Sequence, residues 1–140
     1  MRRSEDFGSL VKRMFQYARA LEVLVADGTL TRERLGRSVP LQWMVTTPLQ
    51  QIGEAAWLLD KQGAELGHGI PLRQVAALRH RLVHHYDGTD WNLVEDVIFE
   101  DVPELVQNLR AVMNEWGLKA DELNLGVAST EPHQAPPTQN

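Results

Sequence analysis

The residues best suited to chemistry lie together in nine positions, Leu78 to Tyr86, which read Leu-Arg-His-Arg-Leu-Val-His-His-Tyr. The segment contains two arginines, three histidines and a tyrosine. Histidine exchanges protons near neutral pH, because its unperturbed pKa is about 6.5. Arginine presents a planar fork of N–H donors that matches a phosphate group. Three interpretations follow: a metal site, a structural helix end, and phosphodiester chemistry.

Metal binding has one point in its favour. His80 and His84 are four residues apart, so their imidazoles would share one face of a helix. However, no glutamate lies between them, and the more distant histidines, His68 and His133, fall in a predicted loop and in the tail. Two ligands do not make a site, so we expect no metal and no other cofactor. The absence of cysteine also excludes disulfides and thiolate zinc sites.

A structural role is the second interpretation. Arginine and histidine near the C-terminus of a helix interact favourably with the helix dipole. Arg73 and Arg81 fit solvent-facing positions as well as they fit contacts to RNA phosphates. His85 lies between the other candidates and is given no role.

Metal-independent phosphodiester cleavage is the third interpretation. Cleaving RNA requires a proton taken from the 2′-hydroxyl, a proton given to the leaving oxygen, and a fixed cation beside the phosphoryl oxygens. His84 and Arg79 supply these groups. On a regular helix, positions five apart point about 140° away from each other. The pair therefore converges only if the helix loosens near His84, or if two chains pair about a twofold axis.

Apolar residues at helical spacing predict an all-α fold, an antiparallel bundle of four main helices with short connections. The first helix is expected over 7–26, capped by Asp6 or Ser4, and a short helix over 31–35. The second is expected over 41–62, kinked at Pro48. The third opens at Pro71 and carries the nine-residue segment. The fourth is capped by Asp90 and ends at Gly117.

The sequence Asp101-Val102-Pro103-Glu104 resembles a capping box that restarts a helix. We therefore expect the fourth helix either to restart there or to bend at Pro103.

Length and composition predict one helical domain over 1–118, followed by a flexible, disordered tail over 119–140. There is no apolar run long enough for a membrane span and no signal peptide, so a cytoplasmic protein is expected.

The net charge of −5 hides an asymmetry in how charge is distributed along the chain. Residues 1–86 carry 12 Lys and Arg against 8 Asp and Glu, whereas residues 87–140 carry 2 against 11. The nine-residue segment thus lies at the end of the basic half of the chain, which could attract a phosphate. Acidic helices that only keep the protein soluble would explain the asymmetry equally well.

Several segments together resemble one protein family. The arrangement of Arg79, His84 and Tyr86 resembles the R-x4-H-x-Y signature of HepT-like proteins, a compact bacterial branch of the HEPN superfamily. Residues 49–56, Leu-Gln-Gln-Ile-Gly-Glu-Ala-Ala, resemble the family's L-Q-x-I-G-E-A segment. Residues 70–73 resemble its lead-in to the motif, and residues 101–105 its D-L-P-x-L segment. The resemblance covers about residues 7–116.

The resemblance implies a homodimeric all-α protein whose arginine and histidine lie in a cleft at the dimer interface. It implies a metal-independent endoribonuclease that acts as the toxin of a type VII-like toxin–antitoxin pair. Arg79 and His84 would be catalytic. The expected partner is an MntA-like nucleotidyltransferase antitoxin, which neutralises the toxin by adding AMP to the motif tyrosine, here Tyr86.

The chain departs from the family pattern after the motif arginine, where His80 stands in place of the usual asparagine. This change leaves an alternative open: a catalytically weak helical dimer that binds RNA or a partner. Glu54 is expected to pair with a motif arginine, either orienting it or as a structural ion pair. Trp57 and Trp91 are expected in the core or at the dimer interface.

Overall fold

The computed structural model describes residues 6–84 and 88–126 of the chain, and over these ranges the fold is all-helical, as predicted. Its elements are α1 (Phe7–Ala26), α2 (Arg32–Leu35), α3 (Val39–Lys61), α4 (Leu72–His84), α5 (Trp91–Asp96), the π-helical turn η1 (Val97–Asp101) and α6 (Val102–Trp116).

The first helix has the predicted bounds. Asp6 caps it by accepting a hydrogen bond from the backbone N–H of Gly8 at 2.9 Å. The helix ends at Asp27, and Gly28 takes a left-handed φ of 86°, which glycine adopts without steric cost. Thr29 donates side-chain and backbone hydrogen bonds that lower the pKa of the Asp27 carboxyl below its ordinary value.

The short helix and the second long helix are also confirmed. Thr31 caps α2, and Ser38 caps α3 by accepting from the N–H of Leu41 at 3.2 Å. The long helix begins two residues before the expected start, because Pro40 is accommodated in its first turn. It continues through Pro48 to Lys61.

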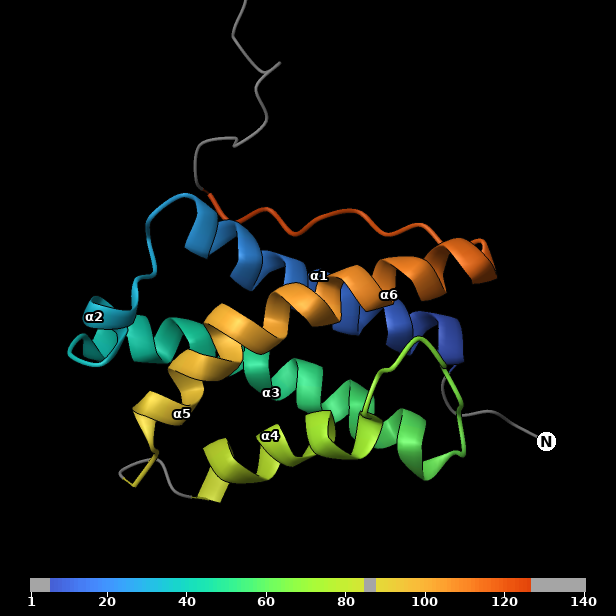
Figure 1. Ribbon diagram of the computed structural model, residues 1–140, viewed down its shortest axis with the longest axis horizontal. Helices are drawn as coiled ribbons and strands as arrows, with labels where there is room; N and C mark the ends of the chain where they lie inside the picture. The colour runs from blue at the N-terminus through green and yellow to red at the C-terminus, as the bar shows by residue number, and fades with distance from the viewer. Residues whose placement is uncertain (1–5, 85–87, 127–140) are drawn as a thin grey trace, which may run out of the picture.

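The helices pack in a fixed order around α1 and α3. α3 packs against both α1 and α4, and α6 packs against α1. Figure 1 shows that each of these neighbouring pairs runs in opposite directions. α4 packs almost entirely against α3, so much of its surface is left for other contacts. One continuous core joins these helices; its fully buried large side chains include Leu10, Met14, Leu21, Leu49, Ile52, Leu59 and Leu109.

Gly53 sets the distance between α3 and α4. A β-carbon at this position would lie 2.8 Å from the backbone nitrogen of Arg79 and 3.0 Å from its Cβ. Atoms cannot approach so closely, so only glycine allows the two helices to meet here. The approach places the backbone of Arg79 directly against α3.

The predicted capping box at Asp101 is wrong. Asp101 has helical dihedral angles and makes no side-chain cap hydrogen bond, because the chain is already helical there. α5, η1 and α6 follow one another without a break, and the π-helical turn ends two residues before Pro103. Proline lacks the N–H that an α-helix would use, and the wider π-turn accommodates that loss.

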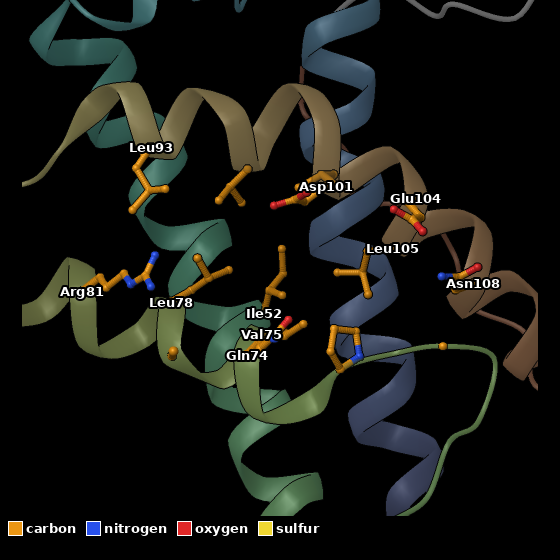
Figure 2. Close-up of a pocket in the computed structure, with 15 residues that line it drawn as sticks. Ile52, Gln74, Val75, Leu78, Arg81, Leu93, Asp101, Glu104, Leu105 and Asn108 are labelled. Atoms are coloured by element: carbon orange, nitrogen blue, oxygen red, sulfur yellow. The ribbon is translucent and has the colours of Figure 1, made fainter.

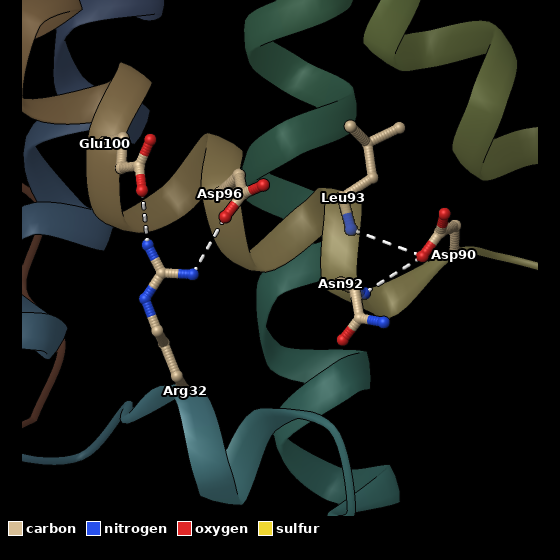
Figure 3. A network of polar contacts seen from close by, with 6 residues as sticks. All are labelled: Arg32, Asp90, Asn92, Leu93, Asp96 and Glu100. Carbon is tan, nitrogen blue, oxygen red and sulfur yellow. Dashed lines mark hydrogen bonds and ion pairs between the residues drawn. The ribbon is translucent and has the colours of Figure 1, made fainter.

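Polar contacts attach α2 to the α5–η1 segment (Figure 3). The Arg32 guanidinium donates to Asp96 at 2.9 Å and to Glu100 at 2.8 Å, and it lies 5.3 Å from the centroid of the Phe99 ring. The hydrogen bond to Asp96 raises the pKa of Arg32 above its ordinary value. Asp90 caps α5 by accepting from the N–H groups of Asn92 and Leu93. These contacts hold α5 in place after the nine-residue segment.

The described part of the predicted tail runs along α1. Gln16 donates to the backbone oxygen of Asp121 at 2.7 Å, and Arg19 pairs with Glu122 at 3.1 Å. The remainder of the tail, residues 127–140, lies outside the described residues. None of the helices in the described ranges is long and apolar enough to cross a membrane.

Replacing Gly53 with alanine should destabilise the protein by about 1–3 kcal/mol, because the added β-carbon forces α3 and α4 apart. Urea unfolding followed by circular dichroism measures the effect. Gly8→Ala is the matched control, since its β-carbon would meet side-chain atoms and no backbone, Leu118 Cδ2 at 3.2 Å and Asp6 Oδ1 at 3.4 Å. Equal stabilities of Gly53→Ala and wild type would contradict the close approach.

Candidate functional site

α4 carries five of the predicted site residues on one regular helix, and the side chains of four of them are described. It begins directly after Pro71, whose carbonyl accepts the N–H of Val75 at 3.0 Å. Leu72 and Leu82 are buried and anchor the helix to the core. The helix contains no acidic residue, so its exposed surface is positively charged. Arg73, Arg79, His80 and Arg81 are therefore presented by a rigid element.

Arg79 is held by two side chains of α3. Its guanidinium lies 3.0 Å from the carboxylate of Glu54 and over the Trp57 ring, 4.5 Å from the ring centroid. The pair predicted for Glu54 therefore forms, and it forms with the motif arginine. Both side chains of the pair are 37% exposed, so solvent screens the attraction and the pair adds little to stability. Its structural consequence is to restrict where the guanidinium lies.

Trp57 lies outside the core, so of its two expected places the dimer interface stays a prediction. It is half-buried on α3, with the Lys61 ammonium also 4.5 Å from the ring centroid. Trp91, by contrast, packs against the core as expected. The contact between Trp57 and Arg79 was not predicted, although the spacing of residues on α3 could have indicated it. Gly53, Glu54 and Trp57 lie within about one turn of α3, on the side of the helix that meets α4.

The other basic residues of α4 differ in what they contact. Arg73 is 89% exposed and lies 3.7 Å from Asp60 of α3. Arg81 is exposed and lines a groove toward α5 and α6. His80 is exposed. Arg73 and Arg79 therefore both contact side chains of α3, whereas Arg81 borders the groove.

The groove lies between α4 and the α5–η1–α6 segment and has a volume of about 510 Å³. Figure 2 shows side chains from the two walls pointing toward one another across it, with Leu78 and Arg81 from α4 facing Leu93 and Asp101. Its floor is apolar, while Asp101 and Glu104 make the far wall acidic. The sequence did not predict this groove, because it depends on how far α4 stands from α6.

His84 is the last residue of α4. Its position in the helix is described but its side chain is not, and Tyr86 lies outside the described residues. α4 stays helical through His84, so the helix does not loosen before the motif histidine. Positions five apart on a regular helix point about 140° away from each other, so the convergence of Arg79 and His84 through pairing of two chains stays a prediction.

The described part of the site offers one arginine, Arg79, whose guanidinium is restrained by Glu54 and Trp57 beside other basic residues. Arg79 can present N–H donors to a phosphate, and Lys61 and Arg73 add positive charge nearby. Within residues 6–84 and 88–126, no three His, Asp or Glu side chains are grouped so as to hold a metal ion. His68 instead contacts Glu115 of α6 at 2.9 Å.

A double-mutant cycle of Glu54→Gln and Arg79→Ala should give a coupling free energy of less than about 1 kcal/mol that shrinks further in 1 M salt, because the pair is half-exposed. Chemical denaturation of the four proteins measures it. A coupling free energy of zero at low salt would show that the pair does not form in solution.

Comparison with known proteins finds that the chain is similar to ribonucleases of the HepT-like family. The family model described as "Ribonuclease HepT-like" matches residues 14–112. The match includes α3, α4 and most of α6, and thus every element that builds the site. No solved structure matches the chain.

Several curated proteins are also similar to the chain. "Probable ribonuclease HepT" of Thermococcus cleftensis is 34% identical over 64 residues, which are 46% of this chain and 58% of that protein. A "Putative RNase" of Caldanaerobacter subterraneus is 29% identical over 65 residues, again 46% and 58% of the two chains. A "Putative RNase" of Methanocaldococcus jannaschii is 27% identical over 94 residues, 67% and 78% of the two chains. The first two matches thus span less than two thirds of each relative's own length.

Proposed function

Because the chain belongs to the HepT-like ribonuclease family, we propose that it is a metal-independent endoribonuclease that acts as the toxin of a type VII-like toxin–antitoxin pair. Family membership supports a ribonuclease function in general, and RNA is the corresponding substrate. The observation that carries the specific proposal is Arg79, fixed at 3.0 Å from Glu54 on a helix without acidic residues. A held cation on a basic surface is what phosphodiester cleavage requires.

In the proposed mechanism, Arg79 and His84 are the catalytic residues. The 2′-oxygen attacks phosphorus as its proton is removed, and the bond from phosphorus to the 5′-oxygen breaks as that oxygen receives a proton. His84 serves as the general acid or base, which suits an imidazole near neutral pH. Arg79 donates N–H groups to the phosphoryl oxygens, whose negative charge increases in the transition state.

The active form is proposed to be a homodimer in which two four-helix domains, each over 1–118, meet at the catalytic cleft. The argument is geometric, since Arg79 and His84 diverge on one helix but can converge from two chains. Arg73 and His80 would contact RNA near the cleft, as would Arg81, and Glu54 would support Arg79. The tail over 119–140 would form no part of the catalytic cleft, and its residues Asp121 and Glu122 contact α1. The cytoplasm, where RNA is available, is the proposed location.

Control of the toxin is proposed to act through Tyr86, two residues beyond His84. An MntA-like nucleotidyltransferase would transfer AMP to the tyrosine oxygen, releasing pyrophosphate from ATP. The added phosphate would place negative charge beside the motif and compete with RNA for its cations.

Purified protein should cleave RNA in the presence of EDTA, and Arg79→Ala or His84→Ala should slow cleavage by at least about a hundredfold. Gel analysis of a labelled RNA measures the rate. Asn124→Ala, in the extended segment beyond α6, is a suitable control. RNA binding without any cleavage would support the alternative of a catalytically weak RNA-binding dimer. Cleavage abolished by EDTA would instead support a metal-dependent mechanism.

Co-expression with a nucleotidyltransferase encoded beside the gene should increase the intact mass by whole AMP units, because Tyr86 supplies a phenolic acceptor. Mass spectrometry of the intact protein measures the increase, which should vanish in Tyr86→Phe. The control is Tyr17→Phe, on α1, which should still be modified. An increase that persists in Tyr86→Phe would exclude Tyr86 as the acceptor.

A further inference from the structure

The guanidinium of Arg79 is held in two chemically different ways. Glu54 accepts a hydrogen bond from one of its nitrogens, Nη1, at 3.0 Å. Trp57 contributes the face of its ring, 4.5 Å from the guanidinium carbon. Both side chains come from α3, and the close approach at Gly53 brings the Arg79 backbone to them. The position of the guanidinium therefore depends on α3 as much as on its own helix.

The two contacts differ in what they leave available. An arginine has five N–H donors, all lying in the plane of the guanidinium. A carboxylate uses those donors and so competes directly with a phosphate for them. A ring beneath the cation attracts it through the π-electron face and uses none of its donors. Trp57 can therefore hold Arg79 in place while the fork of donors stays available for substrate.

The environment of Trp57 fits such a role better than a role in the core. The ring is half-buried, whereas Trp91 and Trp116 pack against the hydrophobic cluster. Lys61, one helical turn after Trp57, places a second cation 4.5 Å from the same ring centroid. Two cations, Arg79 and Lys61, thus lie at one ring, and the carboxylate of Glu54 is paired with only the first of them.

We propose that Trp57 is a positioning residue, which holds the guanidinium of Arg79 so that its N–H fork faces the RNA phosphate. The proposal rests on the proposed ribonuclease function and deepens it. When RNA binds, its phosphate competes with Glu54 for the N–H donors of Arg79. The contact with Trp57 then keeps the Arg79 guanidinium in place, so that it turns neither toward the Glu54 carboxylate nor into solvent. Trp57 itself touches neither the phosphate nor the leaving oxygen.

The test compares Trp57→Leu with Trp57→Phe. Leucine keeps an apolar but smaller side chain without a π-face, whereas phenylalanine restores a π-face that is weaker than that of tryptophan. In Trp57→Leu, kcat for RNA cleavage should fall about tenfold, equivalent to about 1.4 kcal/mol, while KM changes by less than about twofold. Trp57→Phe should recover most of the lost rate. Trp116→Leu, which removes a half-buried tryptophan of the same size from α6, should leave kcat unchanged.

A second measurement does not depend on catalysis. In the NMR spectrum of the wild type, the side-chain protons of Arg79 should be shifted upfield by the Trp57 ring. The shift should be lost in Trp57→Leu, persist in part in Trp57→Phe, and persist fully in Trp116→Leu. Circular dichroism confirms that each variant is folded.

The outcomes separate this proposal from the proposed function. If the wild type cleaves RNA and a folded Trp57→Leu cleaves it with unchanged kcat, the positioning role is overturned and the ribonuclease stands. If the wild type cleaves no RNA, the ribonuclease proposal fails, and with it the role of Trp57 in catalysis. Absence of the upfield shift in the wild type would overturn the Arg79–Trp57 contact on which the proposal is built.

Discussion

The backbones of α3 and α4 meet at Gly53, where a β-carbon would lie 2.8 Å from the amide nitrogen of Arg79. Because α4 packs almost entirely against α3, this contact governs the placement of the whole helix. It brings Arg79 within reach of Glu54 and Trp57, which a helix held further away would not allow. The same approach leaves α4 separated from α6, and the groove of about 510 Å³ occupies that space.

One short helix therefore carries two surfaces with different properties. Arg73 and Arg79 contact acidic and aromatic side chains of α3, and Lys61 of α3 adds a cation at the ring beside Arg79. Arg81 instead borders an apolar groove with an acidic far wall. The cations beside α3 are those that the proposed ribonuclease function would use. Because α4 is helical through His84, the proposal takes the other half of the site from a second chain.

The sequence predicted the helices well because their signals are local. The apolar period and the Asp6 cap gave α1 its bounds, and Thr31 and Ser38 cap the next two helices as their types favour. The capping box at Asp101 failed because the tertiary structure keeps the chain helical there, and a π-turn accommodates Pro103. The Glu54–Arg79 pair was predictable from one glutamate on an apolar-rich helix. The Trp57–Arg79 contact was missed although Gly53, Glu54 and Trp57 lie on one side of α3. The groove was not predictable, since it depends on the distance between α4 and the α5–η1–α6 segment.

The central claim is that Arg79 and His84 act together from two chains. Its most direct test is a mixed dimer, assembled from one Arg79→Ala chain and one His84→Ala chain that carry different affinity tags. If the site combines residues of both chains, the mixed dimer retains one intact pair and should recover up to about half of the wild-type cleavage rate. Each parent dimer should stay inactive. A mixed dimer that is verified by native mass spectrometry and is as inactive as its parents would contradict the account.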